Sequence, residues 1–329
     1  MHDLSRQRTA ALLESARDAE IAVVGDLMLD RYFWGQVTRV SPEAPVPVVD
    51  VENETYHLGG AANVAANLTT LGVRALLCGV VGDDTSGRML RQVAADAGLD
   101  ASCIAVSRDR PTTVKTRVIG NNQQLLRLDR EVRSDVSASD ADAIVATLDN
   151  HANLRGIVLA DYNKGLLSSA LIERVLKLAA SRGIRTFVDP KHNNFFSYKG
   201  AFLVKPNRKE AQDVLGYVIQ SDDDIVRAGR ELLERLECEN VLLTLGASGM
   251  MLFERDGNIS SVPTKAQAVA DVSGAGDTTI ATLAAMIAGG SSVREAAALA
   301  NVAAGVVVEV PGIVPITREA LLNALDDSE

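Results

Sequence analysis

The sequence predicts an α/β fold with a mostly parallel central sheet that helices cover on both faces. Two observations carry this prediction: short, continuous apolar runs alternate with helical patterns, and the two segments that break the alternation have a β-strand composition. Continuous apolar runs are typical of strands buried on both faces of a parallel sheet. The runs expected to form strands are residues 21–24, 75–81, 156–160, 185–188, 201–204 and 241–245.

The helices between these runs are marked by periodicity and by end signals. Apolar residues between 225 and 236 fall on one face at the helical period of 3.6 residues. Residues 222–224 are aspartates that precede this face, where negative charge suits a helix N-terminus. Gly183 closes a helix expected over residues 169–182.

Residues 31–58 and 108–130 interrupt the alternation and predict a small β-sheet lid. The first segment combines three prolines with β-favouring valines, and the second alternates around a polar turn at Gly120-Asn121-Asn122. We therefore expect residues 1–329 to form a single domain, with an inserted lid formed by about residues 31–58 and 108–130.

Composition argues against several classes of function. The 329 residues carry a net charge of −10 without a basic stripe, which argues against binding to nucleic acid or an anionic membrane. No apolar run approaches the ~20 residues of a membrane span. The three cysteines are scattered, and the N-terminus lacks the apolar stretch of a signal peptide. These features predict free thiols and a cytoplasmic protein.

The segment from Asp271 to Asp277 carries the strongest chemical signal. Gly274 and Gly276 let the backbone bend toward a ligand, and the unpaired amides at the start of the following small-residue helix can face an anion. Asp277 stands beside this anion hole, where a carboxylate can accept the proton of a hydroxyl group. The segment predicts phosphoryl transfer with Asp277 as the base; the alternative is a glycine turn in which Asp277 caps the helix.

The segment from Gly59 to Asn63 opens another helix. Its glycines admit close contact between the backbone and a ligand, and Asn63 can hold hydroxyl groups with its donor and acceptor atoms. The alternative is a tight start of a helix without a ligand.

Asn207 and Glu210 lie one helical turn apart, a spacing that suits oxygen ligands of hydrated Mg²⁺. The same spacing defines a helix capping box, and both interpretations stay open. Residues 244–249 form a glycine loop after a strand, which suits either a nucleotide contact or a hairpin turn. No Walker loop, dinucleotide fingerprint or HExxH motif occurs.

Four predicted strands are followed by an aspartate: Asp26, Asp83, Asp161 and Asp189. Ligands of such sheets bind beyond the carboxyl ends of the strands, so the four together predict a polar cleft. Aspartate is also common in turns, which is the alternative for any one of them.

These motifs together resemble those of the ribokinase-like (PfkB) carbohydrate kinases, over nearly the whole chain. The resemblance implies a ribokinase-like three-layer α/β/α fold, ATP as phosphate donor, and Gly274, Ala275, Gly276 and Asp277 as anion hole and catalytic base. Val272 stands where the family usually has threonine, at a position away from the chemistry.

The resemblance also assigns the binding residues. At the sugar it implies Asp26, Gly59, Gly60 and Asn63. At the nucleotide it implies Thr244, Gly246 and Gly249, with Asn301 near adenine. For metals it implies Asn207 and Glu210 for Mg²⁺, held through water, and Asp271 and Ser273 as part of a monovalent-cation site, with dependence on K⁺ left open.

A narrower resemblance is to the heptose 7-phosphate kinases within this family. It rests on residues 39–48 of the lid, on Asp161-Tyr162-Asn163-Lys164-Gly165 and on Asp189-Pro190-Lys191. It implies phosphorylation of O1 of D-glycero-β-D-manno-heptose 7-phosphate to the 1,7-bisphosphate, for ADP-heptose and lipopolysaccharide core synthesis. Many relatives add a cytidylyltransferase-like domain with an HxGH motif, which this sequence lacks, so the resemblance is to the stand-alone kinase.

An anionic sugar needs local cations in an acidic protein. Lys164, Lys191, Arg117 and Arg127 are the candidates at the sugar phosphate or at the γ-phosphate, with surface ion pairs as the alternative. Gln123 or Gln124, from the lid hairpin, is expected to add contacts to the sugar.

The valine-rich lid leaves unpaired strand edges and apolar surface, so we expect a homodimer formed through the lid. Two other functions compete with the heptose kinase. One is a kinase of the same fold for fructose phosphate, ribose or a nucleoside. The other is a non-catalytic sugar sensor, against which the intact Asp277, Asn207 and Glu210 argue.

Overall fold

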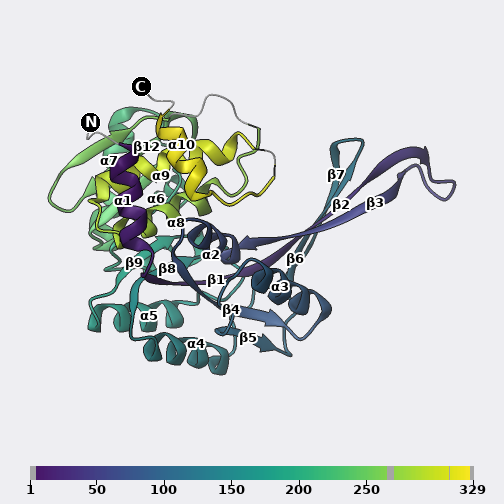
Figure 1. The fold of residues 1–329 in the computed structure, drawn as a ribbon, viewed down its shortest axis with the longest axis horizontal. Coiled ribbons are helices and arrows are strands. Elements are labelled where there is room, and N and C mark those ends of the chain that lie inside the picture. Colours follow the sequence, from purple (N-terminus) through teal and green to yellow (C-terminus); the bar gives the residue numbers. More distant parts are fainter. Residues whose placement is uncertain (1–4, 265–269, 311, 327–329) are drawn as a thin grey trace.

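The computed structural model describes residues 5–264, 270–310 and 312–326. They form a three-layer α/β body from which a second, narrower sheet projects as a lid (Figure 1). The strands of the body are β1 (Glu20–Gly25), β4 (Arg74–Gly82), β5 (Ile104–Ser107), β8 (Leu154–Ala160), β9 (Arg185–Asp189), β10 (Leu203–Val204), β11 (Asn240–Thr244), β12 (Met250–Glu254) and β13 (Ile259–Val262). The strands of the lid are β2 (Leu27–Val40), β3 (Pro47–Gly60), β6 (Thr113–Gly120) and β7 (Gln123–Arg130).

The helices alternate with the strands of the body along the chain. The α-helices are α1 (Arg6–Ala16), α2 (Ala61–Thr70), α3 (Thr85–Asp96), α4 (Ala138–Asn150), α5 (Ser169–Ser181), α6 (Arg208–Leu215), α7 (Asp222–Leu236), α8 (Ala275–Ala288), α9 (Val293–Val308) and α10 (Arg318–Asp326). The 3₁₀ helices are η1 (His192–Ser197) and η2 (Gly246–Ser248). Within the described ranges, no helix has both the length and the apolar character that a membrane crossing requires.

The large sheet is mostly parallel, as the apolar runs predict. Its order over the described residues is β13-β12-β11-β10-β9-β8-β1-β4-β5, and only the β11–β12 and β12–β13 pairs are antiparallel. The chain passes from β1 to β4 on one side of the sheet and later returns through β8 on the other side. The β1–β8 boundary is therefore a switch point, where open α/β sheets bind their ligands.

Strand β1 shows why both faces of this sheet are covered. Ile21 and Val23 point into a core formed with α1, α2, α8 and α9, whereas Ala22 and Val24 point into a second core formed with α4, α5 and α7. All four side chains are fully buried. Side chains of a strand alternate between its two faces, so a continuous apolar run requires a helical layer on each side.

The lid is a four-stranded sheet in the order β3-β2-β6-β7, and it extends away from the body (Figure 1). Its β6–β7 hairpin turns at Asn121 and Asn122, whose φ angles are 51° and 63°. Tight hairpin turns need positive φ angles, which asparagine adopts more readily than most residues. The base of the lid packs on the body through Leu29, Leu58 and Val114. The lid is therefore anchored at one end and projects freely at the other.

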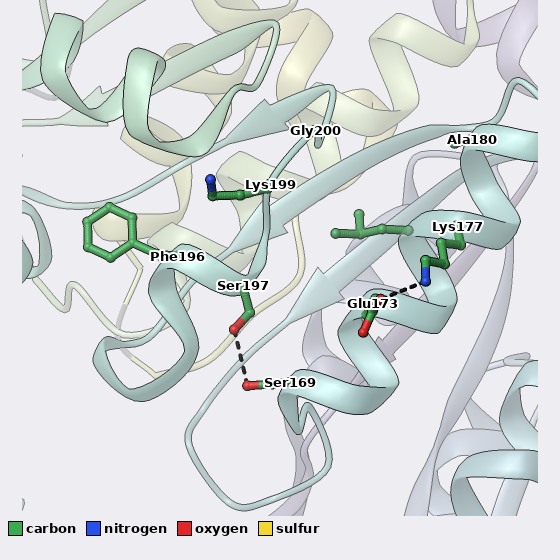
Figure 2. Close-up of a pocket in the computed structure, with 9 residues that line it drawn as sticks. Ser169, Glu173, Lys177, Ala180, Phe196, Ser197, Lys199 and Gly200 are labelled. Carbon is green, nitrogen blue, oxygen red and sulfur yellow. Dashed lines mark hydrogen bonds and ion pairs between the residues drawn. The ribbon is translucent and has the colours of Figure 1, made fainter.

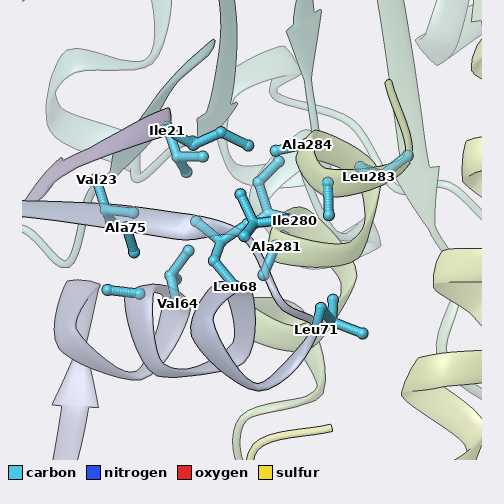
Figure 3. Close-up of a cluster of buried hydrophobic side chains, with 14 of the residues drawn as sticks. Ile21, Val23, Val64, Leu68, Leu71, Ala75, Ile280, Ala281, Leu283 and Ala284 are labelled. Atoms are coloured by element: carbon cyan, nitrogen blue, oxygen red, sulfur yellow. The ribbon is translucent and has the colours of Figure 1, made fainter. Parts of the chain in front are cut away.

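Helix α2 packs against α8 and against β1 (Figure 3), while α8 also contacts β8 and β9. The labelled side chains in this contact include Val64, Leu68, Ile280, Ala281 and Ala284. Alanines on α8 permit a close approach, so the first turns of the two helices come together at the edge of the sheet.

A buried amide, Asn67, ties this junction together. Its Nδ2 donates to the carbonyl of Asn63 at 2.8 Å, and its Oδ1 accepts from the Thr278 hydroxyl and the Ile316 amide, both at 2.9 Å. One side chain thus connects α2, the first turn of α8 and the segment that precedes α10.

We expect Asn67→Ala to lower the free energy of unfolding by about 2–3 kcal/mol, because buried donors and acceptors lose their partner. Urea denaturation at neutral pH measures the difference. Asn150→Ala, at the exposed end of α4, is the control and should change the midpoint little. Equal midpoints for both variants would contradict the role given to Asn67.

Candidate active site

The candidate site lies at the carboxyl edge of the large sheet, at its switch point. Asp26 follows β1, Asp161 follows β8 and Asp189 ends β9, and all three carboxylates are buried. Asp83 follows β4, but its carboxylate is exposed and lies 4.0 Å from Arg108. Three of the four strand-end aspartates thus belong to the buried part of this edge.

The start of α8 has the backbone geometry of an anion site. Gly274 precedes the helix with a φ of 82°, and no side chain caps the first turn. The amides of Gly276 and Asp277 have no hydrogen-bond acceptor among the described residues, and that of Ala275 makes only a long contact of 3.4 Å with the Val272 carbonyl. Unpaired amides at the positive end of a helix favour a bound anion.

Asp277 lies in the first turn of α8 and is held from two sides. Asn63 Nδ2 donates to its Oδ2 at 2.7 Å, and the Tyr162 hydroxyl donates to its Oδ1. The pKa of Asp277 is raised to about 6: burial is the main cause, the hydrogen bonds from Tyr162 and Asn63 oppose the rise, and the nearby carboxylate of Asp189 adds to it. Near neutral pH the carboxylate is therefore ionised and basic, as a general base requires.

Tyr162 is a site residue that the sequence motifs do not identify by role. Burial and the nearby carboxylate of Asp277 raise the pKa of its phenol well above the usual value, so the hydroxyl stays protonated and donates. The DYNKG segment marks the position, but only the fold brings it to Asp277.

Asp26, expected at the sugar, already accepts three backbone amides in this structure. Its Oδ2 accepts the amides of Tyr162 and Lys164 at 2.9 and 3.0 Å, and its Oδ1 accepts the amide of Leu166 at 3.0 Å. In this structure the carboxylate fixes the loop after β8. A contact with a sugar hydroxyl is left to its remaining lone pair.

Gly59 and Gly60 end β3 where the lid meets α2. A Cβ on Gly60, whose φ is 61°, would lie 2.4 Å from the Asp26 carbonyl oxygen, and one on Gly59 would lie 2.1 Å from Asp30 Oδ2. Because these oxygen atoms lie where a Cβ would be, only glycine fits at both positions. Asp30, buried and paired with Arg117, is a second residue of this region that the motifs do not reveal.

A buried lysine, Lys205, lies beside the anion site. Its Nζ is 3.1 Å from Asp189 Oδ2, and both groups lie within 4 Å of the position that a Cβ on Gly276 would occupy. Only 3% of Lys205 is exposed, which is rare for lysine unless it is paired. The signal in the sequence was a charged residue directly after the apolar run that forms β10.

Asn207 and Glu210 form the capping box of α6. Asn207 Oδ1 accepts the Glu210 amide, and Glu210 Oε2 accepts the Asn207 amide, both at 2.9 Å. Glu210 Oε1 also accepts from the Lys191 ammonium, which lies 4.0 Å from Asp189. With these contacts in place the two residues fit Mg²⁺ through intervening water and not as direct ligands. No cluster of three or more histidine, cysteine or acidic side chains within the described ranges could hold a metal alone.

The glycine loop after β11 is the turn of a β-hairpin, the alternative that the sequence left open. Thr244 pairs with Met250, and Gly246 and Gly249 have positive φ angles within the turn. Thr244 also bridges to Asn207, which brings the loop next to the capping box. Asn301 on α9 donates through Nδ2 to the Pro263 carbonyl at 2.7 Å.

Asp271 and Ser273 form a side-chain turn before α8. Asp271 Oδ1 accepts the Ser273 amide at 2.9 Å, and Oδ2 accepts the Gly312 amide at 3.2 Å. Both oxygens thus have protein donors, and this geometry gives no positive sign of a cation.

Gln123 and Gln124 are exposed at the turn of the β6–β7 hairpin, far out on the lid. At the level of Gln123, Gly120 pairs with Gly35 of β2. The sugar end of the site is at the level of Met28, seven residues earlier on β2, which lies against Gly59 and Gly60. At ~3.3 Å per residue, the turn is about 23 Å from the sugar end of the site. The structure does not bring these glutamines to Asp277 within one chain.

A groove on the body, away from the strand ends, is a different feature. It has a volume of about 490 Å³ and is lined by α5, by the end of η1 and by residues 197–200 (Figure 2). Its lysines are already paired, Lys177 with Glu173 and Lys199 with Glu237. The groove lacks the unpaired amides and the basic carboxylate of the candidate site.

The class of protein that this fold and site define is a small-molecule kinase. The pfkB family carbohydrate kinase pattern matches residues 18–319, and the chain belongs to this family. It is therefore a carbohydrate kinase, an enzyme that transfers phosphate to a sugar hydroxyl, and the predicted family is confirmed.

Curated relatives are similar over most of this chain. The bifunctional protein HldE of Paramagnetospirillum magneticum is 43% identical over 314 residues, which cover 95% of this chain and 64% of that protein. HldE of Geobacter sulfurreducens is 41% identical over 323 residues, which cover 98% and 66%. The chain thus spans just under two thirds of the length of these relatives.

Solved structures show the same fold. The Arabidopsis thaliana ribokinase complexed with ribose and ATP matches with a TM-score of 0.73 and 21% identity, covering 94% of this chain and 99% of that one. The Escherichia coli phosphofructokinase-2 in complex with potassium matches with a TM-score of 0.77 and 18% identity, covering 94% and 98%. The ribokinase-like α/β fold with a small second sheet is confirmed.

Tyr162→Phe is expected to shift the pH dependence of catalysis. Loss of the hydroxyl donor raises the pKa of Asp277 above its value of about 6, and a base is lost as pH falls through its pKa. The acidic limb of the kcat/KM profile should therefore move to higher pH. Tyr217→Phe removes a hydroxyl paired with Glu231 elsewhere and serves as control. An unmoved limb in Tyr162→Phe would count against the coupling.

Proposed function

We propose that this chain uses ATP to phosphorylate O1 of D-glycero-β-D-manno-heptose 7-phosphate, giving the 1,7-bisphosphate for ADP-heptose and lipopolysaccharide core synthesis. The observation that carries the chemistry is the basic, buried carboxylate of Asp277 beside unpaired amides of α8. Similarity to the HldE proteins supports the choice of sugar. Because ATP is the donor and the three cysteines are free and buried, we place the reaction in the cytoplasm.

In this mechanism Asp277 accepts the proton of the attacking hydroxyl while the γ-phosphoryl group of ATP transfers in line to that oxygen, and ADP leaves. Asn63 and Tyr162 hold the carboxylate in position, and the amides of Ala275, Gly276 and Asp277 stabilise charge on the migrating group. Positioning and electrostatics dominate such reactions.

Charges around the donor phosphates complete the proposed site. Lys205 and Lys191 supply positive charge on the side of Asp189. Asn207 and Glu210 would hold Mg²⁺ through water, and the ion would supply neutralising charge for the phosphates of ATP. Asp271 and Ser273 would contribute to a site for K⁺, which the negative charge of Asp271 favours. Thr244, Gly246, Gly249 and Asn301 are proposed to border the nucleotide.

We expect Asp277→Asn to lower kcat by about 10²–10⁴ while ATP still binds, because general-base assistance is lost and the amides remain. Steady-state kinetics with heptose 7-phosphate and titration with a fluorescent ATP analogue measure the two effects. Asp256→Asn, in an exposed turn, is the control. Turnover close to wild type in Asp277→Asn would remove its assignment as base.

A panel of sugars with Mg-ATP separates the proposed function from its rivals. Preference for fructose 6-phosphate, ribose or a nucleoside would replace the heptose substrate within the same family. No turnover of any sugar would favour a sugar sensor.

We also propose a homodimer formed through the lid. Strand β7 is an edge of the lid sheet and is exposed along its whole length. Leu126 and Leu128, 51% and 54% exposed, project from the same face of this edge. An apolar unpaired edge is a surface that a second copy of the chain would cover.

The double substitution Leu126→Lys and Leu128→Lys should convert the dimer to a monomer, because charge opposes edge pairing. Sedimentation velocity measures the mass. Val218→Lys, which alters an exposed valine on the body, should leave the dimer intact. A monomeric wild-type protein, or a dimer that survives the double change, contradicts the proposed interface.

A further inference from the structure

The β6–β7 hairpin of the lid is attached to the body by the residues on either side of it, 110–112 and 130–136, which we call the hairpin root. Thr112 donates through its amide and its hydroxyl to the two carboxylate oxygens of Asp84, at 3.1 and 2.8 Å. The same hydroxyl accepts the Gly82 amide at 2.9 Å. Because Asp84 also caps α3, the hairpin root is held by the turn between β4 and α3.

The hairpin root also contacts the loop after β8, residues 161–166. The Gly165 carbonyl accepts the Val136 amide at 2.9 Å. A Cβ on Gly165, whose φ is 91°, would lie 2.0 Å from the Ser134 carbonyl oxygen. The loop and the hairpin root therefore touch backbone to backbone, with no room for a side chain at this point.

Arg110 adds a side-chain link between the hairpin root and the same loop. Its Nη2 donates to the Lys164 carbonyl at 2.5 Å and to the Val132 carbonyl at 3.4 Å. The amide of Lys164 is held by Asp26 at 3.0 Å. Arginine keeps its charge in proteins, and a charged donor makes a stronger hydrogen bond than a neutral one. The backbone of Lys164 is therefore fixed on both sides, by an anion and by a cation.

The loop that Arg110 holds determines where the Tyr162 hydroxyl lies. Tyr162 belongs to this loop, and its hydroxyl donates to Asp277 Oδ1. Burial raises the pKa of Asp277, and this hydrogen bond opposes the rise. Asp189 and Lys205, the other charged groups that act on this pKa, lie at the ends of β9 and β10. A displaced loop would thus weaken the donation from Tyr162 and leave those two groups in place.

We propose that Arg110 is a positioning residue through which the β6–β7 hairpin of the lid holds Tyr162 in place at the catalytic base. The inference rests on the proposed function, in which Asp277 is that base. The bonds from Arg110 to backbone carbonyls tie the loop to the hairpin root, so a rearrangement of the hairpin reaches Tyr162 along this path. A sugar that binds between the lid and the body then sets the position of the base as well as its own.

Arg110→Met, which keeps an unbranched side chain and removes the donors, tests this role. We expect kcat to fall about tenfold, the effect on a rate of losing one hydrogen bond from a charged group. The acidic limb of the kcat/KM profile should move to higher pH, as in Tyr162→Phe, because a weaker donation raises the pKa of Asp277. Arg110→Lys, which keeps the charge, should recover part of kcat.

A double-mutant cycle with Tyr162→Phe gives the decisive comparison. If Arg110 acts through Tyr162, Arg110→Met should lower kcat much less in the Tyr162→Phe background than in the wild type. The matched control is Arg182→Met, because Arg182 is another half-buried arginine, which donates to the carbonyls of Leu148 and His151. This control should leave kcat and the limb unchanged. Additive effects of Arg110→Met, or a limb that moves in Tyr162→Phe but not in Arg110→Met, would overturn the proposal.

Failure of the proposed function gives a different pattern from failure of the positioning role. The cycle is measured with the sugar that the wild type uses best, so it does not depend on heptose 7-phosphate. If Asp277→Asn keeps wild-type turnover, the assigned base falls, and a non-additive cycle still shows that Arg110 positions Tyr162. If Asp277→Asn is inactive and the cycle is additive, the base stands and the positioning role is wrong. Should urea denaturation show that Arg110→Met is unfolded, Arg110→Lys enters the same cycle with the same expectation.

Discussion

The geometry of the site depends on one buried carboxylate that takes no direct part in the proposed chemistry. Asp26, at the end of β1, accepts three backbone amides from residues 162–166. Hydrogen bonds to a charged acceptor are stronger than neutral ones, and three on one buried group fix the path of the loop. That loop carries Tyr162 to the proposed base and Lys164 to the lid. A second buried carboxylate, Asp161, accepts the Asn163 amide and the Tyr198 hydroxyl and holds the same loop from behind.

The acidic character of the chain explains how charge is arranged around Asp277. With a net charge of −10, the protein as a whole repels phosphorylated ligands, so local cations have to attract them. Those cations are not exposed singly: most are paired with a carboxylate, and each pair is positioned by a strand end or by the register of the lid. Lys115 is the exception, because the charges around its side chain act only at longer range.

Sequence patterns predicted the layers of this fold well, because strand and helix signals are local. The apolar runs coincide with β1, β4, β8, β9, β10 and β11, and the polar turn at Asn121 and Asn122 closes the β6–β7 hairpin. The antiparallel strands β12 and β13 at the edge were not anticipated: β13 is short and mostly polar, whereas the apolar run from Met250 to Phe253 in β12 was overlooked. The two interpretations of Asn207 and Glu210 could not be separated by spacing, and the structure shows the capping box.

The partners of the site residues were beyond the reach of sequence patterns. The GAGD segment identified Asp277, but nothing local indicates that Tyr162 and Asn63 hold it or that Lys205 lies beside Gly276. For the same reason the sequence could not show the partners of Asp26: the resemblance implied contacts with a sugar, and the structure adds three backbone amides from the loop after β8. The bonds that build the site join residues 136, 214 and 249 positions apart. Such long loops close slowly during folding. A growing polypeptide therefore completes this junction only after the segment around Ile316 has emerged from the ribosome and docked on α2.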